Sequence, residues 1–380
     1  MKKTILVVTQ PEVTHKVGGA ISMFVFLTNL LAESGYEVCG VCNSTTEHRP
    51  AGLHPGVSFY NLFSVDHSTE GFAPKMQNLI REKKPSCIIF FFHYLYIQAE
   101  LGREFDAIPR ILTFHSRPDF YFAFVPHSER KLRALYRNTT AQILFDSYKS
   151  LLPRFIRKGP VCTIPNPVLP VSQSHDTEHV SRKVVFLSRI DRCKGLDLLI
   201  PAFAAAIKIH QDWNLDIWGE FETEELRQEY MKLVVSREAE NHIHFKGVTS
   251  KPLQTLCEYD FCVFPSRFEG FSVGLAESLS VGLPCVGLKK CSGVNEMIID
   301  GYNGLLSEDS VEDMTEKIVR LMESDDLRSD LSQGALAICE RYHVSHIQWQ
   351  WRNLVEHVVQ PVKPDKLFPV KQLVQLISRS

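Results

Sequence analysis

The chain has 380 residues, of which 42 are Lys or Arg and 44 are Asp or Glu, giving a net charge of −2 at pH 7. At roughly 150 residues per domain, this length predicts two or three domains, each long enough to bury its own core. The balanced charge argues against a protein that binds a nucleic-acid backbone, and the 44% hydrophobic content argues against a disordered chain.

No segment has the length of a targeting or membrane-spanning sequence. The apolar run at residues 5–8 is followed at once by Gln10-Pro11, so we expect no secretory signal. The longest apolar stretch, residues 87–97, is about half of the roughly 20 residues that a membrane-spanning helix needs. The one close cysteine pair, Cys39 and Cys42, is expected in a buried strand, and ten cysteines without metal-type spacing fit a reducing cytoplasm.

Short apolar runs alternate with amphipathic segments in the first part of the chain. Phe24, Leu27, Leu30 and Leu31 recur at helical spacing and predict one buried stripe. The expected strands are 4–9, 36–42, 86–92, 110–114 and 141–145, with helices at 20–34 and 75–83. This alternation predicts a parallel sheet with helices on both faces.

A polar stretch at residues 172–183 lacks apolar periodicity and is expected to be a linker. The alternation then restarts, with strands expected at 184–187, 214–218, 242–245, 261–264 and 284–287, and helices at 196–209 and 224–236. Only helical segments follow residue 311, at 311–323, 326–341 and 345–359, before a last amphipathic piece at 370–377. The predicted fold is α/β, with two doubly wound, Rossmann-like domains facing a cleft: residues 1–170, a linker at 171–182, and residues 183–360.

Several common signatures are missing. The sequence contains no Gly-x-Gly-x-x-Gly after a strand and no Gly-x4-Gly-Lys-Ser/Thr. It also contains no Asp-x-Asp pair to hold a metal on a nucleotide diphosphate. Any phosphate must therefore be bound by backbone amides and basic side chains.

Two turns between a strand and a helix offer such groups. Gly18 and Gly19 precede the first helix, where glycines let the backbone approach an anion, but taken alone they are better explained by a tight turn. Arg189 and Lys194 follow the first strand of the second half, at the edge where open α/β sheets bind ligands. Two fixed positive charges there suit a departing diphosphate; solvated surface charges are the alternative.

The most informative segment is residues 264–277. Glu269 and Glu277 are eight positions apart, and the loop after Glu269 leads into a helix whose first N–H groups, around Phe271 to Gly274, would face a phosphate. A glutamate beside a phosphate is unfavourable unless it accepts hydroxyl protons, so sugar hydroxyls are the expected ligands. Glu277 has the alternative of being an ordinary surface charge.

These motifs together resemble the retaining glycosyltransferase family 4, which has the GT-B fold. The resemblance rests on Glu269-x7-Glu277, the Arg189 to Gly195 loop, Gly18-Gly19 and the segment from Ile298 to Gly304, with lesser landmarks at residues 166–168 and 245–247. Ser292-Gly293 departs from the pattern, because a Gly-Gly pair is common there.

The resemblance implies a role for each matching residue. Arg189 and Lys194 would bind the donor diphosphate, Glu269 the hydroxyls of the transferred sugar, and Glu277 the nucleotide ribose. The implied catalytic residues are Arg189, Lys194, Glu269 and His115, and the implied donor-binding residues are Gly18, Gly19, Arg189, Lys194, Glu269, Gly270, Phe271, Ser272, Val273 and Glu277. No metal ion or separate cofactor is expected, and the tail at 361–380 is expected to cross back to the first domain.

The implied activity is transfer of a hexosyl or N-acetylhexosaminyl group, with retention, from a nucleotide diphosphate sugar to a hydroxyl. UDP is the expected nucleotide of the donor. The expected acceptor is a saccharide or glycolipid, as in assembly of lipopolysaccharide or another surface polysaccharide. Residues 103–158 contain eleven basic and five acidic residues, interleaved with aromatics. Such a segment suits an anionic membrane or a phosphorylated glycolipid, or is a solvated face over a core cluster. We therefore expect a cytoplasmic protein with peripheral contact at the inner face of the cytoplasmic membrane and no nucleic-acid partner.

Three alternatives remain open at this stage. A soluble transferase making a small glycoside or disaccharide would share every donor motif. A GT-B epimerase or a phosphorylase-like enzyme fits less well, and for the phosphorylase-like enzyme the sequence shows no cofactor-lysine motif. A non-catalytic protein that binds sugar nucleotides would keep the fold. The presence of all four motif residues argues against it: Arg189, Lys194, Glu269 and Glu277.

Overall fold

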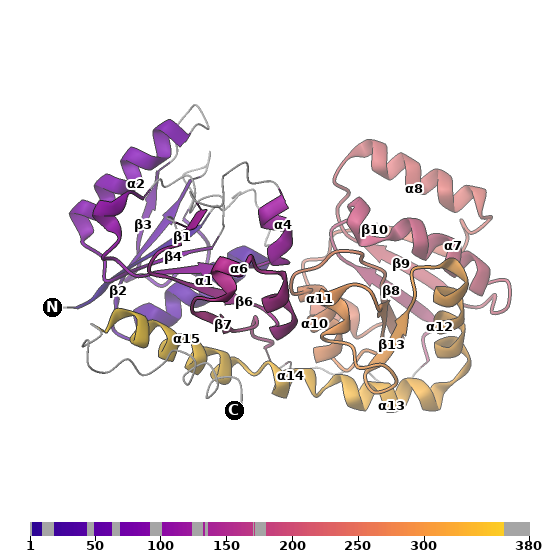
Figure 1. Ribbon diagram of the computed structural model, residues 1–380. Helices are drawn as coiled ribbons and strands as arrows, with labels where there is room; N and C mark the ends of the chain where they lie inside the picture. Colours follow the sequence, from indigo (N-terminus) through magenta and orange to yellow (C-terminus); the bar gives the residue numbers. More distant parts are fainter. Residues whose placement is uncertain are drawn as a thin grey trace. The chain divides into compact units, whose positions relative to one another are not determined.

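The computed structural model contains two compact units, each built on one parallel sheet (Figure 1). Unit 1 comprises Met1–Asn166 and Ser345–Ser380, and unit 2 comprises Pro167–Val344. The structure describes residues 2–9, 19–43, 49–62, 69–91, 101–123, 132–133, 136–169, 171 and 180–360.

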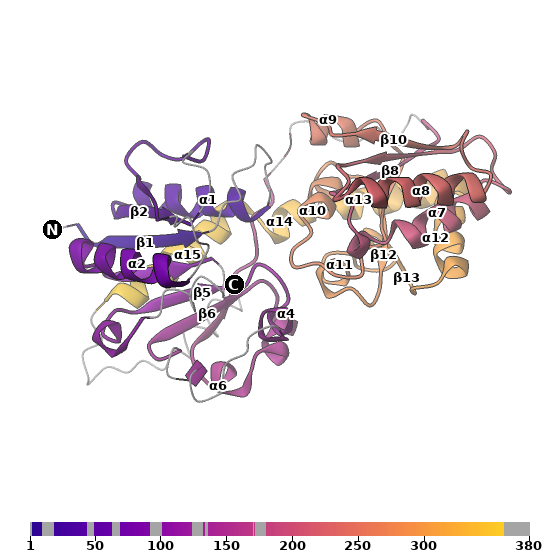
Figure 2. The same cartoon turned by 90° about the horizontal axis from the view of Figure 1, so that it is seen from above.

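Unit 1 has a sheet of order β3-β2-β1-β4-β5-β6-β7, in which every described pair is parallel. The strands are β1 Thr4–Thr9, β2 Glu37–Cys42, β3 Ser58–Asn61, β4 Cys87–Phe90, β5 Arg110–Thr113, β6 Thr139–Ile143 and β7 Val161–Thr163. The helices are α1 Gly19–Glu33, α2 Thr69–Lys83, α4 Pro118–Ala123, α6 Arg154–Arg157 and α15 Val344–Val359, with short 3-10 turns at Arg103–Phe105 and Asp146–Leu151. Figure 2 shows α1 and α2 on opposite faces of this sheet, as a doubly wound fold requires.

Unit 2 has a second parallel sheet, of order β10-β9-β8-β11-β12-β13. Its strands are β8 Lys183–Leu187, β9 Asn214–Trp218, β10 Ile243–Gly247, β11 Phe261–Phe264, β12 Cys285–Leu288 and β13 Gly304–Ser307. Its helices are α7 Leu196–Ala206, α8 Glu224–Ser236, α9 Pro252–Leu256, α10 Val273–Ser280, α11 Ser292–Asn295, α12 Val311–Glu323, α13 Asp325–Ala335 and α14 Ile338–Arg341, with a 3-10 turn at Arg192–Lys194. Helix α7 packs between α8 and α12, and α10 packs against α9, α13 and α14. The predicted fold class of two doubly wound α/β domains is confirmed.

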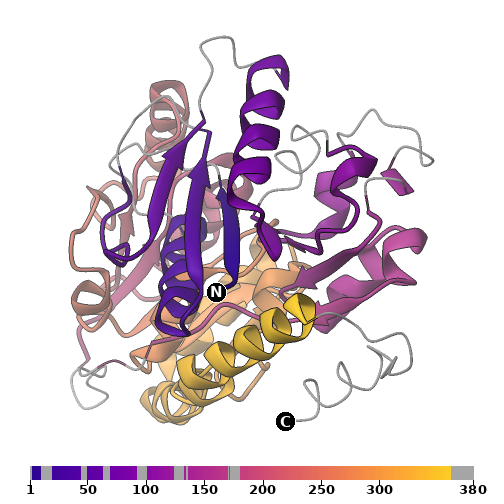
Figure 3. The ribbon, with the colours of Figure 1, turned by 90° about the vertical axis from the view of Figure 1, so that its left-hand side faces the viewer.

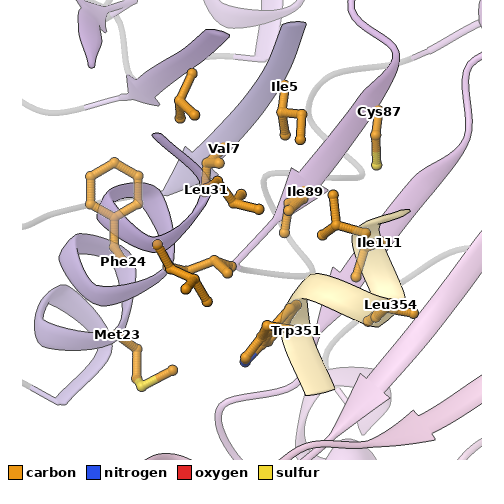
Figure 4. Close-up of a cluster of buried hydrophobic side chains, with 14 of the residues drawn as sticks. Ile5, Val7, Met23, Phe24, Leu31, Cys87, Ile89, Ile111, Trp351 and Leu354 are labelled. Atoms are coloured by element: carbon orange, nitrogen blue, oxygen red, sulfur yellow. The ribbon is translucent and has the colours of Figure 1, made fainter. Parts of the chain in front are cut away.

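Helix α15 belongs to unit 1, although the sequence analysis assigned residues up to 360 to the second domain. Its apolar stripe, which includes Trp351 and Leu354, packs with α1 on one face of the unit 1 sheet. Figure 4 shows Trp351 and Leu354 beside Ile89 and Ile111, and Figure 3 shows α15 running along this sheet. The chain therefore returns to unit 1 at Ser345, before the tail at 361–380, which lies outside the described residues.

Most expected elements are present with small shifts at their ends. The bounds expected for β1, β9, β11, α8 and α12 are those observed. Two edge strands, β3 and β7, were not predicted, because a partly exposed four-residue strand and a three-residue strand give no clear apolar period. The single helix predicted over 326–341 is divided into α13 and α14.

Candidate active site

Two loops of unit 2 meet where the strand order reverses. The chain winds outward from β8 through β9 to β10, and then returns to place β11 on the other side of β8. Loops that follow two such strands enclose the usual ligand site of an open α/β sheet. Here the loop after β8 carries Arg189 and Lys194, and the loop after β11 carries Glu269.

The two loops are in direct backbone contact. The N–H of Arg267 donates to the carbonyl of Cys193 at 2.9 Å. Gly195 has φ of +75°, and a Cβ there would lie 2.1 Å from the carbonyl oxygen of Pro265. Only glycine meets both requirements, so this residue sets how closely the loops approach.

Lys194 and Glu269 form an ion pair across this contact. The Lys194 Nζ lies 2.6 Å from the Glu269 Oε1, and the two side chains are only 13% and 9% exposed. Helix α11, which follows β12, packs against the same glutamate: a Cβ at Gly293 would lie 2.5 Å from the Glu269 Cβ. Burial and the charge of Glu269 raise the pKa of the neighbouring Cys291 thiol to about 11. Glu269, in the loop after β11, thus lies between the loop after β8 and helix α11, with Lys194 as its cation.

Arg189 is placed differently from Lys194. Its side chain is 72% exposed, and its Nη2 donates to Asp191 Oδ2 at 3.0 Å. Asp191 also accepts the N–H of Cys193 at 2.9 Å and caps the 3-10 turn. One carboxylate therefore orients both the loop and the Arg189 guanidinium, which reaches toward solvent.

Helix α10 begins directly after the Glu269 loop. Its N-cap, Ser272, is buried and makes no side-chain capping bond, while Val273 is exposed. Gly270 is partly exposed, and Phe271 packs edge-on against Tyr342, with ring centroids 5.4 Å apart. The start of this helix is also close to β8, because a Cβ at Gly274 would lie 2.9 Å from the Leu187 carbonyl oxygen.

Glu277 lies one turn into α10. Burial raises the pKa of its carboxyl group to about 7. Glu277 is only partly exposed, unlike a fully solvated surface charge. Such a carboxyl group exchanges its proton near neutral pH, where a change in its surroundings alters its charge.

The sequence analysis gave no role in the site to Arg267, Ser266 or Ser292. Arg267 lies in the loop after β11. Its Nη1 is 2.7 Å from Oδ1 of Asp197, in the first turn of α7, and its Nε is 3.2 Å from Oδ2 of Asp309, which follows β13. The hydroxyls of Ser266 and Ser292 are buried without a hydrogen-bond partner in the described part of the chain. Arg267 was adjacent to the predicted motif, but no periodicity distinguishes it from a surface arginine.

His115 lies in unit 1, directly after β5. Its Nε2 is 2.8 Å from the Thr113 hydroxyl, and its ring stacks on Phe91 with centroids 4.6 Å apart. Burial lowers its pKa to about 4, so the imidazole is neutral at pH 7. Gly19 begins α1, as expected for the strand-to-helix turn, whereas Gly18 lies outside the described residues.

Among the residues that the structure describes, no group of three or more His, Cys, Asp or Glu side chains is arranged to hold a metal ion. No helix among them has both the length and the apolar character to cross a bilayer. Cys39 and Cys42 are both buried in β2, as predicted.

The chain is similar to known glycosyltransferases. Residues 171–337, which lie within unit 2, match the family model described as glycosyl transferases group 1. An uncharacterized glycosyltransferase of Haemophilus influenzae is 22% identical over 344 residues, covering 89% of this chain and 96% of that protein. The poly(ribitol-phosphate) alpha-N-acetylglucosaminyltransferase of Staphylococcus aureus is 28% identical over 170 residues, covering 44% of this chain and 34% of that enzyme.

Solved structures match across both units. The pneumococcal O-GlcNAc transferase GtfA, in complex with UDP and GlcNAc, superposes with a TM-score of 0.73 at 14% identity, covering 95% of this chain and 100% of that chain. This likeness establishes the fold as GT-B. The family-model match, the sequence relatives and the fold together support a GT-B glycosyltransferase.

Proposed function

We propose that this protein is a retaining, metal-independent glycosyltransferase of family 4. It transfers a hexosyl or N-acetylhexosaminyl group from a UDP-sugar to a hydroxyl of a saccharide or glycolipid acceptor, in lipopolysaccharide or other surface-polysaccharide assembly. The Staphylococcus aureus relative, whose name specifies an N-acetylglucosaminyl group and a polymer of ribitol phosphate, fits this class of reaction.

One observation carries the proposal: Lys194 and Glu269 are buried together at the switch point of the unit 2 sheet. A cation and a carboxylate side by side suit a ligand with a diphosphate next to a ring of hydroxyls, because the cation binds the phosphate and the carboxylate accepts from the hydroxyls. The exposed guanidinium of Arg189 supplies a second positive charge on the same loop.

The proposed reaction uses these charges on the leaving group. The bond between the anomeric carbon and the diphosphate oxygen breaks, and the acceptor oxygen forms its bond on the same face of the sugar. The acceptor proton passes to the departing phosphate oxygen, so UDP and the glycoside are the products. Arg189 and Lys194 would stabilise the charge that develops on the diphosphate, the kind of preorganised electrostatic effect that contributes most to catalysis.

The remaining roles are proposed from the same resemblance. Glu277 would accept the ribose hydroxyls, and the N–H groups at the start of α10, from Gly270 to Val273, would face the diphosphate. Gly18, Gly19 and His115 would act from unit 1, with His115 as a neutral hydrogen-bonding group near the sugar. We further propose that the protein acts in the cytoplasm, at the inner face of the membrane, through the basic segment at 103–158.

The first experiment measures the melting temperature of the purified protein with UDP, GDP, ADP, CMP or NAD. A ligand that binds only the folded state raises the melting temperature by mass action, about 2.7 kcal/mol of stabilisation at a hundredfold excess over Kd. We expect UDP to exceed the others and to lose its effect in Glu277→Ala. A flat response to every nucleotide in the wild type would contradict the donor assignment.

Product analysis then tests the chemistry. UDP-sugars are incubated with candidate acceptors with and without EDTA, and the anomeric configuration of the product is read by NMR. We expect retention of configuration and an unchanged rate with EDTA. Trials with free sugars and with lipid-linked saccharides separate a small-glycoside enzyme from one that acts on glycolipids.

A further inference from the structure

The buried cation at the switch point of the unit 2 sheet is bound by a carboxylate of the protein itself. The Lys194 Nζ lies 2.6 Å from the Glu269 Oε1, and the two side chains are 13% and 9% exposed. An ammonium group binds a carboxylate oxygen and a phosphate oxygen in the same way, through a short charge-assisted hydrogen bond. Glu269 therefore competes with any phosphate group that approaches Lys194.

The backbone on both sides keeps the two charges together. An added Cβ at Gly195 would lie 2.1 Å from the Pro265 carbonyl oxygen, so the loop that carries Lys194 is fixed against the loop that carries Glu269. On its other side Glu269 meets helix α11, because an added Cβ at Gly293 would lie 2.5 Å from the Glu269 Cβ. A phosphate bound to Lys194 thus stays close to the Glu269 carboxylate, and two anions in a partly desolvated site repel each other.

A sugar nucleotide and a free nucleoside diphosphate differ in what they offer to Glu269. The sugar brings hydroxyl groups, which donate to the carboxylate and compensate for the sharing of its cation. The free diphosphate brings no such donor next to its terminal phosphate, which also carries more negative charge than the bridged phosphate of a sugar nucleotide. It therefore takes Lys194 from Glu269 and leaves the carboxylate beside an anion.

We infer that Glu269 is a specificity-determining residue that favours the sugar nucleotide over the free nucleoside diphosphate, because it holds Lys194 unless sugar hydroxyls replace this contact. The inference rests on the proposed function and extends it to the product. After transfer, the sugar hydroxyls leave with the glycoside, and Glu269 pairs again with Lys194. The nucleoside diphosphate is then released more readily, which limits inhibition by this product.

The test compares the Kd of UDP, UDP-glucose and UDP-N-acetylglucosamine by calorimetry with the full chain. Glu269→Gln keeps the shape of the side chain and an acceptor oxygen but removes the charge that holds Lys194. The matched control is Glu229→Gln, because Glu229 pairs at 2.6 Å with Arg192, which is in the same loop as Lys194, yet these two side chains are 48% and 70% exposed. Water replaces either partner of an exposed pair at little cost.

We expect Glu269→Gln to tighten the binding of UDP and to lower the preference for the better UDP-sugar over UDP by about tenfold or more. Glu229→Gln should change each Kd by less than about twofold. The gain for UDP requires the lysine that Glu269 releases. Glu269→Gln should therefore bring no gain when it is added to Lys194→Gln.

Equal changes for UDP and the UDP-sugars in Glu269→Gln would overturn the inference in favour of a general charge effect, while the proposed donor site stands. An unchanged or weaker affinity for UDP in this variant would overturn it as well. If the wild type binds none of the three probes, the proposed function fails and the inference falls with it. Should melting curves show that Glu269→Gln is unfolded, Glu269→Asp takes its place, because it draws the charge back from Lys194 and should also favour UDP.

Discussion

Lys194 and Glu269 are 75 positions apart in the chain, yet the Lys194 Nζ lies 2.6 Å from the Glu269 Oε1. The contact joins the loops after β8 and β11, the two strands that flank the switch point of the unit 2 sheet. Each charge is mostly removed from water, so each depends on the other for its stability.

Removing one member of this pair should cost more than removing both. Lys194→Met leaves the Glu269 carboxylate buried without its cation, and we expect it to lower the free energy of unfolding by about 3 kcal/mol. Adding Glu269→Gln removes the uncompensated charge and should restore more than half of that loss. Urea denaturation of the two single variants and the double variant at pH 7 measures the coupling. If the effects of the two substitutions add, the pair contributes no coupling and this account is wrong.

Arg189 should affect turnover without affecting stability. Its side chain is 72% exposed, so Arg189→Ala removes little packing, but under the proposed function it removes a charge from the leaving diphosphate. We expect kcat to fall by about a hundredfold or more, equivalent to about 3 kcal/mol.

Arg192 supplies a matched control for Arg189. It lies on the same loop, is 70% exposed and is paired with Glu229 at 2.6 Å. Arg192→Ala should keep kcat within about threefold of the wild type. Steady-state kinetics and melting temperatures are measured for both variants. Equal kcat values in the two would show that Arg189 has no specific role in catalysis.

The close approach of the loops should depend on Gly195. Gly195 and Gly301 have nearly the same φ, +75° and +74°, but only Gly195 has a neighbour within 4 Å of an added Cβ. Gly301→Ala should therefore cost about 1 kcal/mol for its backbone conformation alone. Gly195→Ala should cost at least about 2 kcal/mol more, because the Pro265 carbonyl must move. Thermal unfolding compares them, and similar losses would mean that the loop contact is easily relaxed.

The sequence predicted the fold better than it predicted which elements pack together. Alternating apolar runs gave both parallel sheets, because buried strands and amphipathic helices have distinct periods. Helix α15 was predicted as a helix, but an apolar stripe does not say which sheet it covers, and Trp351 packs in unit 1. The short edge strands β3 and β7 had no period to detect.

The candidate site was predicted as a set of residues and not as contacts. Lys194 was assigned to a diphosphate and Glu269 to a sugar, and nothing in either local sequence predicts their ion pair. The stacking of His115 on Phe91 likewise depends on the pairing of β4 with β5. Arg267, which bonds to Asp197 and Asp309, was not predicted, because its partners are far away in the sequence.

Glu277 should make stability depend on pH. Burial raises the pKa of its carboxyl group from its ordinary value of 4.5 to about 7, so between these values the folded protein holds a proton that the unfolded chain releases. The contribution of Glu277 to the free energy of unfolding should therefore be largest below about pH 4.5 and fall as the pH rises to 7. Above pH 7 it should level off about 3 kcal/mol lower. Glu277→Gln should lack this loss and be more stable than the wild type at pH 8. Urea denaturation from pH 5 to 8, with exposed Glu240→Gln as the control, measures it.

The same group should couple UDP binding to pH if Glu277 accepts the ribose hydroxyls. Hydroxyl donors favour the charged carboxylate, so binding lowers the pKa of Glu277 and releases a proton when the pH is near or below 7. UDP affinity should therefore rise between pH 6 and 8 more steeply in the wild type than in Glu277→Gln, which retains any titration of the nucleotide itself. Calorimetry in two buffers of different ionisation enthalpy counts the protons released. If UDP affinity changes equally with pH in the two proteins and both release the same number of protons, Glu277 does not bind the nucleotide. Its raised pKa would then reflect packing alone.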